Sequence, residues 1–186
     1  MNFNKHSELE GLHAYLGASK YHWLNYSDDK LIESYNNFLA IERGTKLHEY
    51  AKQSIELGRK LRGKDTLALY VNDAIGFGMT PEQVLYYSPN AFGTADAIRY
   101  WENKKLLRVH DLKTGLTQAS MNQLKIYDAL FFLEYKISPF DTTIINRIYQ
   151  FDDKFEEEES PEEIKSIMNK IVHCDKLIEE VKLGVK

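Results

Sequence analysis

Apolar side chains recur at intervals of three to four residues near the start of the chain and predict a long helix there. The stretch runs from Asp28 to Arg62 and holds few helix-breaking residues. The positions that would share one helix face are Leu31, Tyr35, Phe38, Ile41, Thr45, His48, Ala51 and Ile55. Because such a face packs against a core, we expect His48 to point inward. Gly44, one turn earlier, leaves room for another segment to approach closely.

Three runs rich in apolar and aromatic residues follow and predict strands, because turn-forming or charged residues separate them. They are Gln83–Ser88, Phe92–Trp101 and Leu106–Lys113. Helical spacing returns over Gln118–Ile137, and Ser138-Pro139 ends it. The β-branched and aromatic stretch Thr142–Phe151 predicts a fourth strand.

The last helix is predicted from its capping residues. Ser160 is a favourable cap, Pro161 suits the first helical position, and Glu162 and Glu163 suit the first turn. The element order is then helix, three strands, helix, strand, helix. This order predicts an α/β sandwich with a mixed sheet, whose last strand returns parallel through a crossover helix.

Length and composition favour one globular domain over residues 1–186, with an N-terminal helical extension over 1–30 and a C-terminal helix over 160–183. Apolar residues make up 43% and charged residues 28% of the chain. The net charge of −4 excludes a protein that grips a polyanion with its whole surface. Much of the acidity lies in Asp152–Glu163, so any nucleic acid must be bound locally.

The single cysteine, Cys174, excludes an internal disulfide and a four-thiolate metal or iron–sulfur site built from one chain. No apolar stretch approaches the ~20 residues that a membrane helix needs, and residues 1–20 lack the continuous apolar centre of a signal peptide. We therefore expect a soluble, cytoplasmic protein with no membrane partner.

Strand register brings two carboxylates together. A hairpin of the second and third predicted strands, centred between Asn103 and Lys104, places Asp96 directly opposite Asp111. The neighbours expected on that face are mostly apolar: Thr94, Ile98, Leu107 and Val109. Facing like charges in an apolar setting are destabilising unless something neutralises them.

Two facing carboxylates and an inward-pointing histidine are typical of a Mg²⁺ or Mn²⁺ site, and the imidazole favours Mn²⁺. Lys113, two residues after Asp111, would project from the same face toward a water or a phosphate. Simpler interpretations stay open. An Asp-x-Lys on a strand is a common ion pair, a helix histidine is commonly a core residue, and a β-bulge would shift the register.

Four short motifs stand in order between residues 41 and 128: Gly44-x-x-x-His48, Gly93-Thr94-Ala95-Asp96, Val109-His110-Asp111-Leu112-Lys113-Thr114-Gly115 and Gln123-x-x-x-Tyr127. At these spacings the set resembles the PD-(D/E)XK nucleases, specifically small phage-type members of the RecB- and Cas4-like exonuclease branch. The resemblance implies a restriction-endonuclease-like core, with a mixed central sheet flanked by helices.

The resemblance also implies a role for each matching residue. His48, Asp96, Asp111 and the backbone carbonyl of Leu112 would bind Mg²⁺ or Mn²⁺. Lys113 would be the catalytic lysine, acting with Asp111 and Asp96. Gln123 and Tyr127 would buttress the site and position the substrate strand, although helix packing explains this pair equally well. The chain lacks the cysteine quartet of Cas4-like relatives, so no iron–sulfur cluster is expected.

The function implied is a metal-dependent deoxyribonuclease, expected to be an exonuclease, that hydrolyses DNA phosphodiester bonds in recombination, repair or phage DNA processing. Its partners would be DNA and a helicase or recombination protein, in the cytoplasm of a bacterial or phage-infected cell. Two alternatives stay open: a non-catalytic protein that binds metal or DNA ends on the same fold, and a hydrolase of RNA or another phosphate ester. End preference, polarity and oligomeric state are not readable from the sequence.

Overall fold

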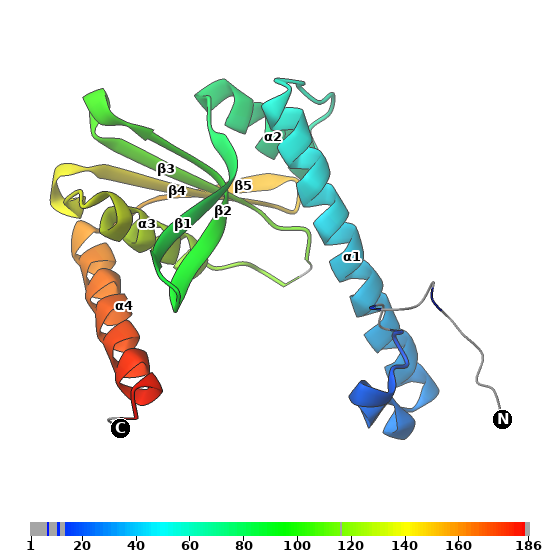
Figure 1. Cartoon of the computed structure of the whole chain (residues 1–186). Helices are drawn as coiled ribbons and strands as arrows, with labels where there is room; N and C mark the ends of the chain where they lie inside the picture. The colour runs from blue at the N-terminus through cyan, green and yellow to red at the C-terminus, as the bar shows by residue number, and fades with distance from the viewer. Residues whose placement is uncertain (1–6, 8–10, 12–13, 116, 185–186) are drawn as a thin grey trace. The chain divides into compact units, whose positions relative to one another are not determined.

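A computed structural model describes residues 7, 11, 14–115 and 117–184 (Figure 1). The chain divides into two compact units, Met1–Arg43 and Gly44–Lys186. Part of the extension predicted over residues 1–30 lies outside the described residues. None of the described helices is long and apolar enough to cross a membrane.

Helices begin and end the described part of the chain, and the strands lie between them. In order they are η2 Ala18–Asn25, α1 Asp28–Glu56, α2 Thr66–Phe77, β1 Thr80–Ser88, β2 Ala91–Trp101, η3 Glu102–Lys104, β3 Leu106–Leu112, α3 Asn122–Tyr135, η4 Pro139–Asp141, β4 Thr143–Gln150, β5 Asp153–Glu158 and α4 Pro161–Lys182. The predicted cap of α4 is confirmed, because the Ser160 hydroxyl accepts a hydrogen bond from the backbone N–H of Glu163.

The strands form one mixed five-stranded sheet in the order β1-β2-β3-β4-β5. Strands β1, β2 and β3 are antiparallel neighbours, β4 lies parallel to β3, and β5 is antiparallel to β4. Helix α3 makes the crossover between β3 and β4, as the sequence predicts. The α/β class, the mixed sheet and the flanking helices are therefore confirmed.

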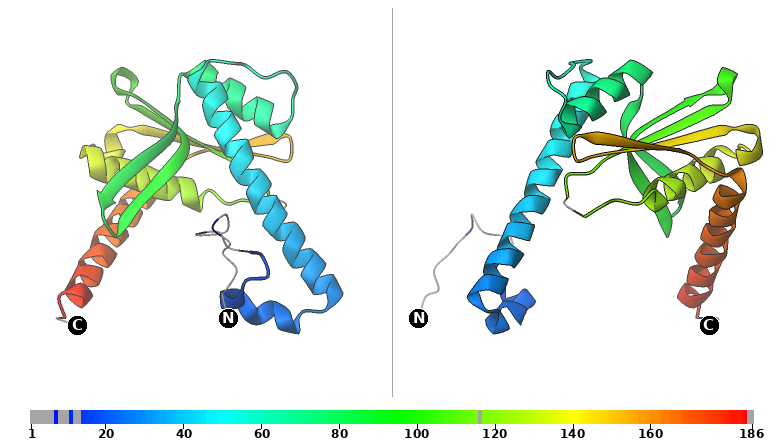
Figure 2. Two further views of the ribbon diagram at one scale, coloured as in Figure 1. Left: turned by 45° about the vertical axis from the view of Figure 1, so that its right-hand side comes forward. Right: turned by 180° about the vertical axis from the view of Figure 1, so that it is seen from behind.

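Each face of the sheet has its own core, and Figure 2 shows α2 and α3 on opposite sides of the sheet. On one face, Leu107 and Val109 of β3 pack with α3 and α4 residues such as Leu124 and Ile164. On the other face, Leu112 and Tyr149 pack with α2 and with the end of α1. The site described below lies where α1 meets this second face.

Helix α1 is buried only over its second half. Gly44, Ala51, Ser54 and Ile55 are buried, and the ring contacts of Tyr35 lie within the first unit, with Tyr15 and Phe38. The expectation of one continuous buried stripe is therefore wrong for Tyr35, Phe38 and Ile41, whose side chains are exposed. The helix also ends at Glu56 rather than Arg62, because Gly58 adopts a left-handed conformation just beyond it.

The sequence interpretation missed α2 and leaves residues 63–82 without an element. Gly76 lies inside the last turn of α2, and the left-handed Gly78 provides the C-cap. The carboxylate of Asp65 caps the start of this helix by accepting a hydrogen bond from the N–H of Ala68.

Strand β5 was also missed, because every one of its residues is exposed and most are charged. Ion pairs anchor it to the sheet. Glu156 contacts Arg108, at 2.8 Å, and Arg147 of β4.

The two edge strands of the sheet carry different protection. Strand β5 exposes the acidic residues Asp153 and Glu156–Glu158. On β1, Pro81 has no N–H to offer, and the N–H of Tyr86 donates a 2.8 Å hydrogen bond to the Glu134 carboxylate of α3.

Candidate metal centre

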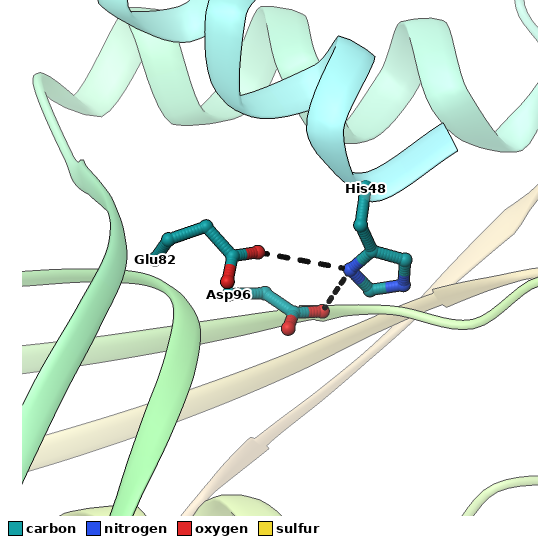
Figure 3. Close-up of side chains that lie close together, drawn as sticks. All are labelled: His48, Glu82 and Asp96. Atoms are coloured by element: carbon teal, nitrogen blue, oxygen red, sulfur yellow. Dashed lines mark ion pairs between the residues drawn. The ribbon is translucent and has the colours of Figure 1, made fainter. Parts of the chain in front are cut away.

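Three ligand-type side chains from separate elements converge at one point (Figure 3). The Nδ1 atom of His48 lies 3.5 Å from Asp96 Oδ2 and 3.9 Å from Glu82 Oε1. One ligand atom from each residue can be chosen so that all three lie within 4.8 Å of one another. Among the described residues this is the group of histidine and carboxylate side chains that could hold a metal ion.

The pairing of β1 with β2 explains why Glu82 belongs to this group. Pro81 pairs with Ala97 and Gln83 pairs with Ala95, so Glu82 falls opposite Asp96. Glu82 has a φ of 49°, in the left-handed region that a residue with a side chain rarely adopts. Both carboxylates therefore come from one position of the hairpin, and α1 supplies the imidazole.

The register predicted for β2 and β3 is confirmed over five pairs, from Trp101–Leu106 to Ala97–His110. The ladder ends there, so Asp96 and Asp111 come directly after its last pair. The Asp96 side chain turns to the backbone and accepts a 2.8 Å hydrogen bond from the N–H of Leu112. Asp111 is buried as predicted, with a side chain only 1% exposed, whereas Asp96 is 12% exposed.

The neighbours expected for the two carboxylates are only partly correct. Ile98, Leu107 and Val109 pack in the core beside α3, whereas Asp96 lies against His48 of α1. Ala95 belongs to the core beside α3 and Ala97 to the core beside α2, although strict alternation would put them on one face. The alternation is therefore broken next to Asp96, which turns its carboxylate toward α1.

Hydrogen bonds connect Asp111 to helix α3. Lys113 Nζ lies 2.8 Å from Asp111 Oδ2 and 3.0 Å from Oδ1, to which it donates. The same ammonium donates to Gln123 Oε1 at 2.7 Å, and Gln123 Nε2 donates to the Tyr127 hydroxyl at 2.7 Å. Asp111, Lys113, Gln123 and Tyr127 are thus linked by one continuous series of hydrogen bonds.

Two glycines let other side chains approach the site. A Cβ atom on Gly93 would lie 2.9 Å from Cε1 of Tyr127, and one on Gly44 would lie 2.9 Å from Oγ1 of Thr114. Both distances are too short for a real Cβ contact. The close approach expected at Gly44 is therefore confirmed, and Thr114 of the loop after β3 is the residue that approaches.

The electrostatics show an excess of buried negative charge. Burial, and then the charge of Asp96, raises the pKa of Asp111 to about 6, although Lys113 opposes the shift. Burial and then Asp96 also raise the pKa of Glu82. Hydrogen bonding to Asp96 raises the pKa of His48, although burial opposes the shift.

The structure brings together His48, Asp96, Asp111, Lys113, Gln123 and Tyr127, all of which the sequence selects. Asp111 is not in the group of ligand atoms within 4.8 Å, but its carboxylate is coupled electrostatically to Asp96. Leu112 contributes its N–H to Asp96, and the role implied for its carbonyl stays a prediction.

Sequence reasoning did not find Glu82. A tight turn at Pro89-Asn90 would place Gln83 opposite Asp96, and the irregularity between Tyr86 and Ser88 shifts the register so that Glu82 takes that position.

The donor set suits a hard divalent cation. Carboxylate oxygens with one imidazole nitrogen are ligands for Mg²⁺ and especially Mn²⁺. Asp111 Oδ2 is buried 2.8 Å from the Lys113 ammonium but accepts no well-directed hydrogen bond among the described residues, so it retains a lone pair. The residues present therefore fit a metal ion.

Comparison with protein-family models, curated proteins and solved structures gives no match to this chain.

Proposed function

We propose that the protein is a metal-dependent nuclease that hydrolyses phosphodiester bonds in DNA, with Mg²⁺ or Mn²⁺ bound by His48, Glu82, Asp96 and Asp111. The observation that carries the proposal is the convergence of His48, Glu82 and Asp96 beside the Asp111–Lys113 pair. Buried carboxylates with raised pKa values are costly for stability, and a cation would offset that cost.

The topology supports a restriction-endonuclease-like core, in which antiparallel β1, β2 and β3 lead through α3 to parallel β4. The proposed site lies at the end of the β2–β3 ladder. This placement and the four ordered motifs support membership of the PD-(D/E)XK superfamily.

Each side chain has a role that follows from its position. His48, Glu82, Asp96 and Asp111 would hold the cation. A bound divalent cation would activate an attacking water and neutralise charge on the phosphate. The Lys113 ammonium cannot bind a cation, so it stabilises negative charge on the phosphate or orients the water. Gln123 and Tyr127 hold that ammonium in place through the hydrogen bonds described above.

The test is incubation of the purified protein with end-labelled linear DNA and closed circular DNA, each with Mg²⁺, Mn²⁺ or EDTA. Cleavage that requires the metal supports the proposal, and loss of linear DNA alone indicates an exonuclease. Calorimetry with Mn²⁺ separates metal binding from turnover. Metal binding without cleavage of DNA would favour an accessory protein that binds DNA ends.

Two variants test the ligand set against a matched control. Glu82→Gln and Asp96→Asn each remove one negative ligand and should weaken Mn²⁺ binding and abolish or strongly reduce cleavage. Glu163→Gln removes a carboxylate that pairs with Lys125 instead, and it should leave both properties unchanged. Unchanged Mn²⁺ affinity in both ligand variants would refute the metal centre.

A further inference from the structure

The hairpin of β1 and β2 has one covered face and one open face. Leu85 and Ala95 are fully buried beside α3, and Gly93 lies against Tyr127. Side chains alternate between the faces of a strand, so those between the covered positions point to the opposite face. They include Val84, Tyr86 and Phe92, which are 50%, 48% and 63% exposed.

The open face leads directly from the candidate metal centre. Glu82 and Asp96 face each other at one end of it, followed on the same face by the pair Val84–Thr94 and then the pair Tyr86–Phe92. At about 3.4 Å per residue, the aromatic pair lies roughly 14 Å along the strands from the two carboxylates. Figure 1 shows β1 and β2 side by side at this edge of the sheet.

An exposed tyrosine facing an exposed phenylalanine is suited to stacking. Aromatic side chains bind unpaired bases through their flat faces, with little dependence on sequence. A stacked strand rises about 3.4 Å per nucleotide, and an unstacked strand is longer, so a separation of roughly 14 Å is spanned by no more than about four nucleotides. A base held on this pair would therefore belong to the same strand as a phosphate at the metal centre. The bases of an intact duplex are stacked on each other and cannot reach such a surface.

We propose that Tyr86 and Phe92 form a stacking platform for unpaired bases, and that the DNA strand cleaved at the metal centre is single-stranded at that point. This inference rests on the proposed nuclease function and names its substrate class. Edge pairing with a second copy is hindered at the same place, because Glu134 occupies the Tyr86 N–H and Pro81 has none.

The test is fluorescence anisotropy with a labelled oligothymidine of 12 nucleotides and a labelled blunt duplex of 12 base pairs. EDTA prevents cleavage, so binding is measured without turnover. Phe92→Ala and the double variant Tyr86→Ala/Phe92→Ala should weaken binding of the single strand, the double variant by at least about tenfold. Binding of the duplex should not change. Tyr86→Phe keeps the ring and should bind as the wild type does.

Phe140→Ala is the matched control, because Phe140 is an aromatic residue of η4 that is 57% exposed, and it should bind as the wild type does. The Mn²⁺ affinity of every variant should equal that of the wild type, since none is a ligand. Single-strand binding that is unchanged in the double variant would overturn the platform and leave the nuclease proposal standing. If the wild type cleaves no DNA, the nuclease proposal is refuted. The anisotropy measurement does not depend on cleavage and still tests the stacking platform.

Sedimentation of the wild type and the double variant tests the competing occupant. A dimer that becomes a monomer in the double variant, with oligonucleotide binding unchanged, would show that a second copy covers this face and would overturn the inference.

Discussion

Gly93 leaves room for the ring of Tyr127, the last residue in the series of hydrogen bonds that begins at Asp111. Because a Cβ at this position would lie 2.9 Å from the Tyr127 ring, Gly93→Ala should displace that ring and lower stability by about 1–3 kcal/mol. The shift should reach Lys113 through Gln123 and slow cleavage, while Mn²⁺ affinity stays unchanged. Kinetics and calorimetry on the same sample measure the two effects.

Gly76→Ala is the control for this variant, because a Cβ on Gly76 would meet nothing within 4 Å. It should leave cleavage unchanged and slightly stabilise α2. Tyr127→Phe keeps the ring but removes the hydroxyl that accepts from Gln123, so it should slow cleavage modestly. If both Gly93→Ala and Tyr127→Phe cleave DNA at the wild-type rate, Tyr127 only packs in the core and does not support catalysis.

Lys113→Ala should separate metal binding from chemistry. Loss of one preorganised group directed at transition-state charge costs about 3–4 kcal/mol, so cleavage should fall by about 10²-fold or more. Mn²⁺ affinity measured at pH 8 should stay near that of the wild type, because an ammonium is not a ligand. Lys113→Arg should restore little activity, since a planar guanidinium differs in shape from the ammonium that fits between Asp111 and Gln123. Cleavage by Lys113→Ala at the wild-type rate would show that Lys113 and Asp111 form only an ion pair.

The residues of the candidate site were largely predictable, and the reason is periodicity. His48 follows from the helix face, and Asp96 and Asp111 follow from a hairpin register that the structure confirms up to Ala97–His110. Glu82 did not follow, because its position depends on a second register and on a left-handed backbone conformation next to Pro81. A preference for that conformation cannot be read from the residue type.

At the scale of elements, the misses have two physical causes. Helix α2 was missed because Gly76 suggests a break, although tertiary packing of Tyr70, Val71 and Ala74 outweighs the low helix propensity of one glycine. Strand β5 was missed because it lacks apolar alternation and depends on pairing with β4 and on the ion pairs of Glu156. A buried face was therefore not enough where a glycine interrupts the pattern, and a strand with no buried face gave no pattern to predict from.

The contact between α3 and β4 includes a carboxyl group that is fully buried. Asn146 Nδ2 donates to Asp128 Oδ2 at 2.7 Å and to Glu159 Oε1 at 3.0 Å, and burial raises the pKa of Asp128 well above its usual range. The folded state therefore binds a proton more tightly than the unfolded state, whose carboxyl titrates near pH ~4. The free energy of unfolding should fall as the pH rises above about 4, until the pH passes the folded pKa.

Asp128→Asn should remove this loss, since an amide oxygen still accepts from Asn146 and carries no charge. Its stability relative to the wild type should increase between pH 4.5 and pH 7.5, measured by urea unfolding in EDTA. The exposed residue Asp141 provides the control, because Asp141→Asn should show no such pH-dependent gain. An equal gain in both variants would contradict the assignment to the buried carboxyl.

At the scale of the whole molecule, every proposed ligand belongs to the unit Gly44–Lys186. Deletion of residues 1–27 leaves α1 intact from Asp28 and should therefore leave Mn²⁺ affinity unchanged in calorimetry. Circular dichroism verifies that the shortened chain is folded. A folded, shortened chain that no longer binds Mn²⁺ would show that the first unit contributes to the metal centre.

The unequal edges of the sheet have a consequence for behaviour at high concentration. Repulsion between the acidic side chains of β5 keeps that edge from pairing with the same edge of another copy. On β1, the Glu134 carboxylate is the group that blocks the N–H of Tyr86. Loss of either safeguard thus favours strand-to-strand aggregation of a chain that is otherwise intact.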